Sequence, residues 1–117
     1  MTGTKRYLKN LIMAERSDGL TKSQYEELCR IFALHPFVDN VKIYGSRAKG
    51  TFTSHSDIDL SISGEKLDRH SLADLLMDLN ESDIPYLIDA QDYKEIQNTR
   101  LKDHIDRIGK VIYQRNG

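Results

Sequence analysis

The chain is poor in the features that mark secreted, membrane-bound and zinc-binding proteins. Among its 117 residues there is one cysteine, Cys29, which excludes an internal disulfide and a cysteine-based zinc cluster. Its longest apolar runs are a few residues, as at 11–14, whereas a membrane span needs about 20 apolar residues and a signal peptide roughly 7–15. No Pro/Gly/Ser-rich linker divides the sequence. We therefore expect a cytoplasmic chain with one core, because a single core typically serves roughly 100–150 residues.

The chain also lacks an excess of charge of one sign. It has 17 Lys and Arg residues against 18 Asp and Glu residues, a net charge of -1 and a pI near 6.4. Proteins that coat nucleic acid usually have a basic surface. We therefore expect no strong direct nucleic-acid binding, although a local basic patch is compatible with this balance.

Helix and strand patterns alternate along the sequence. Three helix-start signals precede apolar residues at helical spacing: Thr21 with Gln24, Ser71 with Asp74, and Asp92 with Glu95. The first helix is predicted to end near Leu34 and the third at Gly109. Four segments have the alternation or the short apolar run of a strand: 38–44, 57–63, 86–90 and 111–113. This mixture predicts an α/β (α+β) fold, with a small mixed sheet flanked by helices.

The first residues are harder to interpret. Tyr7, Leu8, Leu11 and Ile12 would share one face of a helix, which fits either a docking helix or a frayed end. Residues 17–19 (SDG) then predict a break in the helix. We therefore divide the chain into an N-terminal extension of uncertain structure, residues 1–18, and a functional domain, residues 19–117.

Two carboxylates mark the second predicted strand. Asp57 and Asp59 are two residues apart, so they lie on the same face, whereas Ile58, Leu60 and Ile62 lie on the opposite one. Two neighbouring carboxylates repel each other, and a divalent cation such as Mg²⁺ removes that cost. Taken alone, the pair is more typical of the solvated polar face of an edge strand.

A glycine and a serine stand twelve residues before this pair, where the first predicted strand ends. Gly45 lets backbone N–H groups approach an anion closely, and Ser46 adds a hydroxyl. Arg47 and Lys49 supply cations suited to a polyphosphate. The alternative is an ordinary exposed loop with two basic residues. Gly-Ser followed by Asp-x-Asp is more specific than either half and favours a nucleotide site with a metal.

The same loop is not a P-loop. Gly45 and Gly50 have the P-loop spacing, but Thr51 stands where that motif places the lysine that reaches the β- and γ-phosphates.

Residues 41–50 (VKIYGSRAKG) and 56–60 (SDIDL) resemble the motifs of minimal nucleotidyltransferases of the DNA polymerase beta superfamily. The resemblance runs from about Gly19 to Tyr113 and includes residues 84–89 (IPYLID). It implies the nucleotidyltransferase fold, ATP as substrate and two Mg²⁺ ions. Members of this branch are commonly antitoxins that transfer AMP to a tyrosine of a HEPN ribonuclease toxin, so the resemblance implies such a toxin as partner, in a hetero-oligomer.

The resemblance also implies a third carboxylate on the strand after the second helix. By position this residue is Asp89, which joins Asp57 and Asp59 as a catalytic and metal-binding residue. Asp92 is the competitor, but its spacing to Glu95 suits a helix cap better. By the same resemblance, Gly45, Ser46 and Arg47 hold the β- and γ-phosphates.

Two other interpretations of the function stay open. One is an antitoxin that masks its toxin by binding alone; the other is a transferase that acts on a small molecule or on RNA. The four histidines (His35, His55, His70 and His104) show no metal-ligand spacing, and we assign none of them a role in the reaction.

Overall fold

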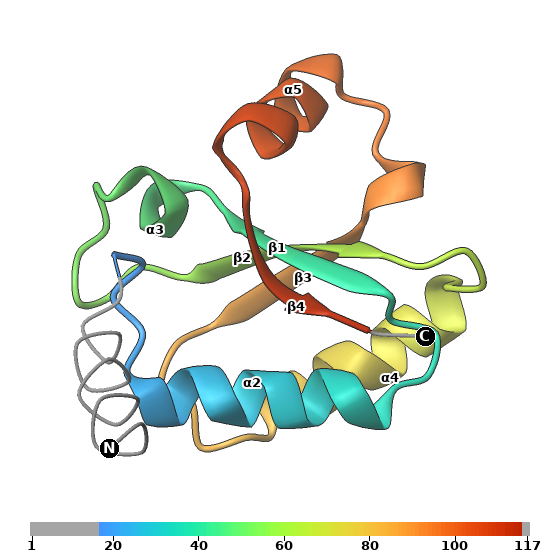
Figure 1. Ribbon diagram of the computed structural model, residues 1–117, viewed down its shortest axis with the longest axis horizontal. Coiled ribbons are helices and arrows are strands. Elements are labelled where there is room, and N and C mark those ends of the chain that lie inside the picture. Colours follow the sequence, from blue (N-terminus) through green and yellow to red (C-terminus); the bar gives the residue numbers. More distant parts are fainter. Residues whose placement is uncertain (1–16, 116–117) are drawn as a thin grey trace, which may run out of the picture.

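We describe residues 17–115 of a computed structural model (Figure 1). Residues 1–16, with the predicted helical face, and residues 116–117 lie outside the described residues. The elements follow in the order α2 (Lys22–Leu34), β1 (Asn40–Tyr44), α3 (Ser46–Lys49), β2 (Ile58–Ser63), α4 (Arg69–Asn80), β3 (Ile88–Asp92), the 3-10 helix η1 (Tyr93–Glu95), α5 (Thr99–Ile108) and β4 (Lys110–Gln114). In residues 17–115 no helix is long and apolar enough to cross a membrane.

The strands form one mixed sheet in the order β3-β2-β1-β4. β1 is antiparallel to both β2 and β4, and β2 is parallel to β3. Figure 1 shows α2 and α4 together on one face of the sheet and α3 and α5 on the other. The α4 helix makes the crossover between the parallel strands, as such connections require. The predicted mixed sheet with flanking helices is confirmed.

The main core lies between the sheet and the α2–α4 layer. Ile58, Leu60 and Ile62 are fully buried there with Leu28 and Leu75 of the helices. Because side chains alternate across a strand, the residues between these three face the other side of the sheet. That side has a smaller apolar cluster around Tyr44, Ile96 and Ile105, so α5 covers only part of it. Tyr44 is buried on this side, in the cluster with Ile105 of α5.

The helix ends partly follow the predicted caps. Thr21 caps α2 through a reciprocal capping box with Gln24, as predicted. The predicted start of α4 at Ser71 is wrong, because Asp68 is the cap and Ser71 is its N3 partner. Both residues are good cap formers, and sequence spacing alone does not rank them.

The region after β3 also differs from the prediction. The strand is shifted toward the C-terminus relative to the predicted 86–90, and Asp92 ends it. Asp92 accepts a hydrogen bond from the Lys94 backbone and caps η1, whereas Asn98 caps α5. The predicted third helix therefore begins later than expected. Gly109 ends α5 and β4 follows it, as predicted.

Candidate active site

Three predicted carboxylates come together on the α5 side of the sheet. Asp59 lies in β2 directly opposite Asp89 in the parallel ladder with β3. Asp57 precedes β2 by one residue and is exposed. Its spacing to Asp59 places both on one face, away from the buried Ile58. The fold thus brings residues from two separate segments to one place.

The charges of these carboxylates act on one another. Partial burial raises the pKa of Asp59 above its usual value, and the charges of Asp89 and Asp57 raise it further. Tyr44, opposite Asp59 in the ladder between β1 and β2, has its pKa raised to about 12, mainly by burial and then by Asp59 and Asp89. The site therefore concentrates negative charge that a cation would relieve.

Gly45 forms the corner between β1 and α3 directly against Asp59. Its backbone has φ 74° and ψ −152°, a conformation that is essentially restricted to glycine. A Cβ atom at this position would come within 2.5 Å of Asp59 Oδ2. The glycine is therefore required twice, by its backbone angles and by the carboxylate packed on its Cα.

Ser46 and Lys49 begin and end the short α3. The Ser46 side chain is half-buried beside this corner, and Lys49 is exposed. Their placement at the Gly45 corner is compatible with the predicted contacts to a polyphosphate, which stay a prediction.

Arg47, for which a contact with the β- and γ-phosphates is predicted, is buried. Its side chain is 1% exposed. Its guanidinium donates to the backbone carbonyl of Ser56 from Nε (3.2 Å) and Nη2 (2.8 Å), and to that of Asp18 from Nη1 (3.0 Å). The Tyr86 ring lies 4.2 Å from the guanidinium carbon. In this arrangement the side chain joins the segments before α2, β2 and β3 and presents no free charge to a phosphate.

His104 is a neighbour of the site that sequence reasoning missed. Gly45 N–H donates to His104 Nε2 at 3.0 Å, and the imidazole packs edge-on against the Tyr44 ring. No spacing rule reveals this contact, because it joins α5 to a corner 59 positions earlier.

Asp92, the competitor for the third carboxylate, is engaged elsewhere. It is 7% exposed, and its carboxylate accepts from Lys94 Nζ at 2.8 Å. Alternation along β3 places it with the buried Ile88 and Ala90, opposite to Asp89. This placement favours Asp89 as the third carboxylate.

The donor set suits a hard cation such as Mg²⁺. Within residues 17–115, no three His, Cys, Asp or Glu side chains are grouped so as to hold a metal ion by themselves. Mg²⁺ is usually bound by one or two carboxylates with water and substrate phosphates, so it does not require such a cage. Asp57, Asp59 and Asp89, the partner of Asp59 on β3, therefore suit a metal ion that binds together with a nucleotide.

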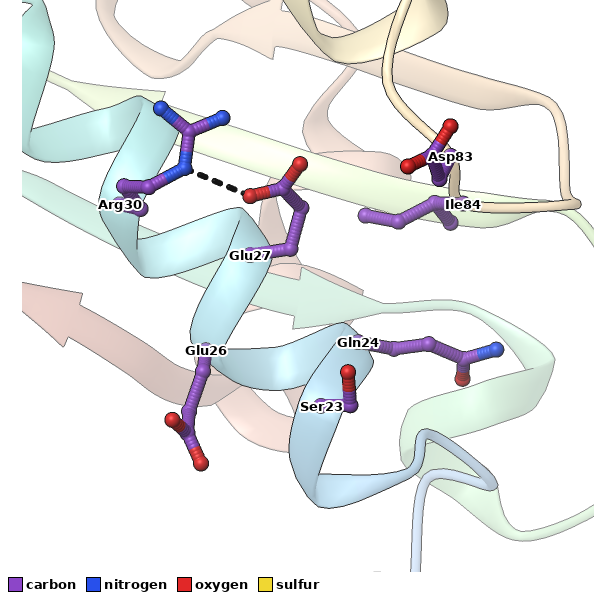
Figure 2. A pocket seen from close by; sticks show the side chains of 7 residues that line it. All are labelled: Ser23, Gln24, Glu26, Glu27, Arg30, Asp83 and Ile84. Atoms are coloured by element: carbon purple, nitrogen blue, oxygen red, sulfur yellow. Dashed lines mark hydrogen bonds and ion pairs between the residues drawn. The ribbon is translucent and has the colours of Figure 1, made fainter.

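A hollow lies in the α2–α4 layer, away from the three carboxylates (Figure 2). It measures about 470 Å³ and lies between α2 and the segment that follows α4. Glu27 and Arg30 pair on α2 at 2.7 Å, and Asp83 and Ile84 lie across from them. None of the predicted site residues lines this hollow.

Comparison with known proteins gives an independent result. A family model described as polymerase beta, nucleotidyltransferase matches residues 26–117. No curated protein sequence matches the chain.

Several solved structures share the fold. A chain in the crystal structure of a toxin–antitoxin with AMP-PNP superposes with a TM-score of 0.66 at 20% identity, over 79% of this chain and 74% of the other. A chain in the structure of a tri-AMPylated Shewanella oneidensis HEPN toxin in complex with MNT antitoxin superposes with a TM-score of 0.59 at 17% identity. The match covers 78% of this chain and 70% of the other. The toxin–antitoxin MntA–HepT gives the same values.

Proposed function

Because the chain belongs to the polymerase beta nucleotidyltransferase family, we propose that it transfers AMP from ATP to a hydroxyl group of a HEPN ribonuclease toxin and thereby acts as its antitoxin. The observation that carries this proposal is the position of Asp59, between Asp89 on the next strand and the Gly45 corner. The similar structures support the choice of nucleotide and partner, since one contains AMP-PNP and another an AMPylated HEPN toxin.

In the proposed reaction an oxygen of the toxin bonds to the α-phosphorus of ATP. The bond to the bridging oxygen breaks, pyrophosphate leaves with that electron pair, and the hydroxyl proton passes to water. Bound Mg²⁺, two ions in our proposal, would neutralise the phosphates and stabilise the attacking and leaving oxygens. Asp57, Asp59 and Asp89 would hold it. This assignment is supported by the register of Asp59 with Asp89 in the ladder between β2 and β3, and by Asp57 directly before β2.

Besides the metal ligands, the reaction needs groups that hold the β- and γ-phosphates, and we assign these to the Gly45 corner. Ser46 offers its hydroxyl and Lys49 its exposed ammonium group. Arg47 acts here as a positioning residue, because its guanidinium fixes the Ser56 carbonyl immediately before Asp57. In this proposal, therefore, the Arg47 side chain holds the segment before Asp57 in place and does not contact the phosphates.

A transfer experiment tests this function. The cognate HEPN toxin is incubated with the chain, ATP and Mg²⁺, repurified, weighed by mass spectrometry and assayed for ribonuclease activity. We expect the mass to rise by one or more AMP groups and the toxin to stay inactive. The Asp57→Asn/Asp59→Asn variant should leave the mass unchanged.

The other interpretations give different results in the same experiment. Masking by binding alone predicts an unchanged mass and full recovery of toxin activity once the partner is removed. A transferase that acts on RNA or on small molecules would consume ATP, by hydrolysis or by transfer of AMP to its own acceptor, without adding AMP to the toxin.

A further inference from the structure

The corner that we assign to the phosphates is attached to α5 by a hydrogen bond. Gly45 N–H donates to His104 Nε2 at 3.0 Å, and the imidazole is half-buried. A backbone N–H can only donate, so Nε2 carries a lone pair and the ring proton lies on Nδ1. His104 is therefore neutral in this arrangement, and the Gly45 N–H is directed at α5 and not at a phosphate.

The sheet itself does not supply this acceptor. β4 pairs with β1 from Asn40 to Ile43, so the ladder between them ends before Gly45. The α5 helix leads through Gly109 directly into β4. His104 on this helix thus provides an acceptor just beyond the end of the ladder, where a backbone N–H would otherwise lack a protein partner.

The position of the imidazole is itself fixed by its surroundings. Ile105, the next residue of α5, is 0% exposed in the cluster with Tyr44 and Ile96. The Tyr44 ring lies edge-on to the imidazole, with the ring centroids 6.0 Å apart and the ring planes at 78°. The acceptor therefore belongs to a packed helix and does not need to be ordered when a nucleotide binds.

Gly45 needs such a contact because it has no side chain to hold its backbone. A glycine with positive φ has more conformations open to it than any other residue. The Asp59 carboxylate packs against its Cα from one side. The hydrogen bond to His104 fixes the peptide plane between Tyr44 and Gly45, and with it the direction in which Ser46 leaves the strand.

We infer that His104 is a positioning residue for the triphosphate: it accepts from Gly45 N–H and holds the corner in the conformation that presents Ser46 to the β- and γ-phosphates. This inference rests on the proposed function and makes α5 part of the nucleotide site. His104 should affect ATP binding more than the chemical step. The reason is that the ladder between β2 and β3, and not the corner, holds Asp59 beside Asp89.

Two substitutions of His104 separate its hydrogen bond from its packing on Tyr44. His104→Phe keeps a ring but removes the acceptor, whereas His104→Gln keeps an acceptor at a similar reach but removes the ring. The Kd of the full chain for AMP-PNP with Mg²⁺ is measured by calorimetry, and the KM for ATP and kcat by transfer to the cognate HEPN toxin.

We expect His104→Phe to raise the Kd and the KM about tenfold, the upper end of the effect of one hydrogen bond, with kcat within about threefold of wild type. His104→Gln should stay within about threefold of wild type in all three quantities. The opposite order of the two variants, which packing alone predicts, would overturn the inference, and so would an unchanged Kd for His104→Phe.

The exchange rate of the Gly45 amide, measured by NMR, gives a readout that does not depend on activity. It should be at least about tenfold faster in His104→Phe than in wild type and in His104→Gln. If His104→Phe does not fold, His104→Ala takes its place with the same expected results. An exchange rate that is equal in all variants contradicts the proposed role.

His70→Phe is the matched control. The His70 side chain is 90% exposed on α4, in the other layer of the fold, and its replacement should change none of these quantities. Wild-type chain that binds AMP-PNP but labels no toxin would contradict the proposed transfer, while the Kd comparison would still decide the role of His104. Wild-type chain that binds no AMP-PNP would contradict both.

Discussion

Asp59 and Asp89 are direct partners in the parallel ladder between β2 and β3. Two carboxylates on neighbouring strands repel each other when no cation is bound. The pKa of Asp59 is raised mainly by its partial burial and further by this repulsion. The arrangement therefore lowers the stability of the metal-free protein.

Asp59→Asn should stabilise the metal-free protein at neutral pH, since it removes a partly buried charge. The folded state holds a proton on Asp59 at a pH where the unfolded chain has lost it. The wild-type free energy of unfolding therefore gains a contribution as pH falls through the raised pKa toward about 4, the ordinary aspartate value. Urea unfolding in EDTA should show the advantage of the variant shrinking over that range. A variant less stable than wild type at pH 7 would contradict this account.

Asp89→Asn should affect the chemical step more than nucleotide binding. We expect kcat for transfer to fall at least ~100-fold, with the KM for ATP within a few-fold of wild type, because the role proposed for Asp89 is to hold the metal that activates the acceptor oxygen. Asp92→Asn is the control: it keeps the cap of η1 and should stay active, provided circular dichroism shows it folded. A dead Asp92 variant beside a normal Asp89 variant would show that the third carboxylate is misassigned.

Gly45→Ala should abolish transfer, whereas Gly50→Ala should not. Both glycines have positive φ, 74° and 82°. A Cβ at Gly45 meets Asp59 Oδ2 at 2.5 Å, but one at Gly50 meets nothing within 4 Å. Each alanine costs about 1–3 kcal/mol of backbone strain. Only the first displaces Asp59, so we expect its rate to fall ~100-fold or more. Transfer rates and thermal unfolding of both variants separate strain from misplacement.

Arg47 and Lys49 should respond to the same substitution in different ways. Arg47→Met leaves the carbonyls of Asp18 and Ser56 without their donor, and we expect a loss of at least ~2 kcal/mol of stability. Lys49→Met should change stability by less than about 0.5 kcal/mol, because Lys49 is exposed. Its KM for ATP should instead rise about tenfold. Chemical denaturation measures the stability of each variant, and the dependence of the transfer rate on ATP concentration measures its KM. An Arg47→Met variant that is as stable as wild type but binds ATP more weakly would show that Arg47 contacts the phosphates directly.

Local patterns predicted the elements that carry the site. The Thr21 capping box and the alternation around Ile58 are set by neighbouring residues, and both are found as expected. The two cap errors, at Ser71 and Asp92, occur where another polar residue nearby competes for the same orphan backbone groups. The sequence alone does not rank such competitors.

What the patterns missed depends on residues far apart in the chain. The sequence predicts a phosphate contact for Arg47 beside Gly-Ser and gives no sign of its partners Asp18 and Tyr86, which come from segments that only the fold brings near. His104 reaches Gly45 in the same way. The facing of Asp89 and Asp59 followed in the prediction from a family resemblance, whereas strand order and register supply its physical basis.

The pairing of β1 with β4 has a consequence for biosynthesis. Asn40 of β1 is opposite Gln114 of β4, so one edge of β1 stays open until β4 has left the ribosome. At about 5–20 residues per second, translation leaves that edge unpaired for several seconds, during which a nascent chain is exposed to aggregation and to chaperones. The Gly45 corner gains its contact with α5 in the same late phase. A newly made chain therefore completes its sheet and the Gly45 corner only after α5 and β4 have emerged.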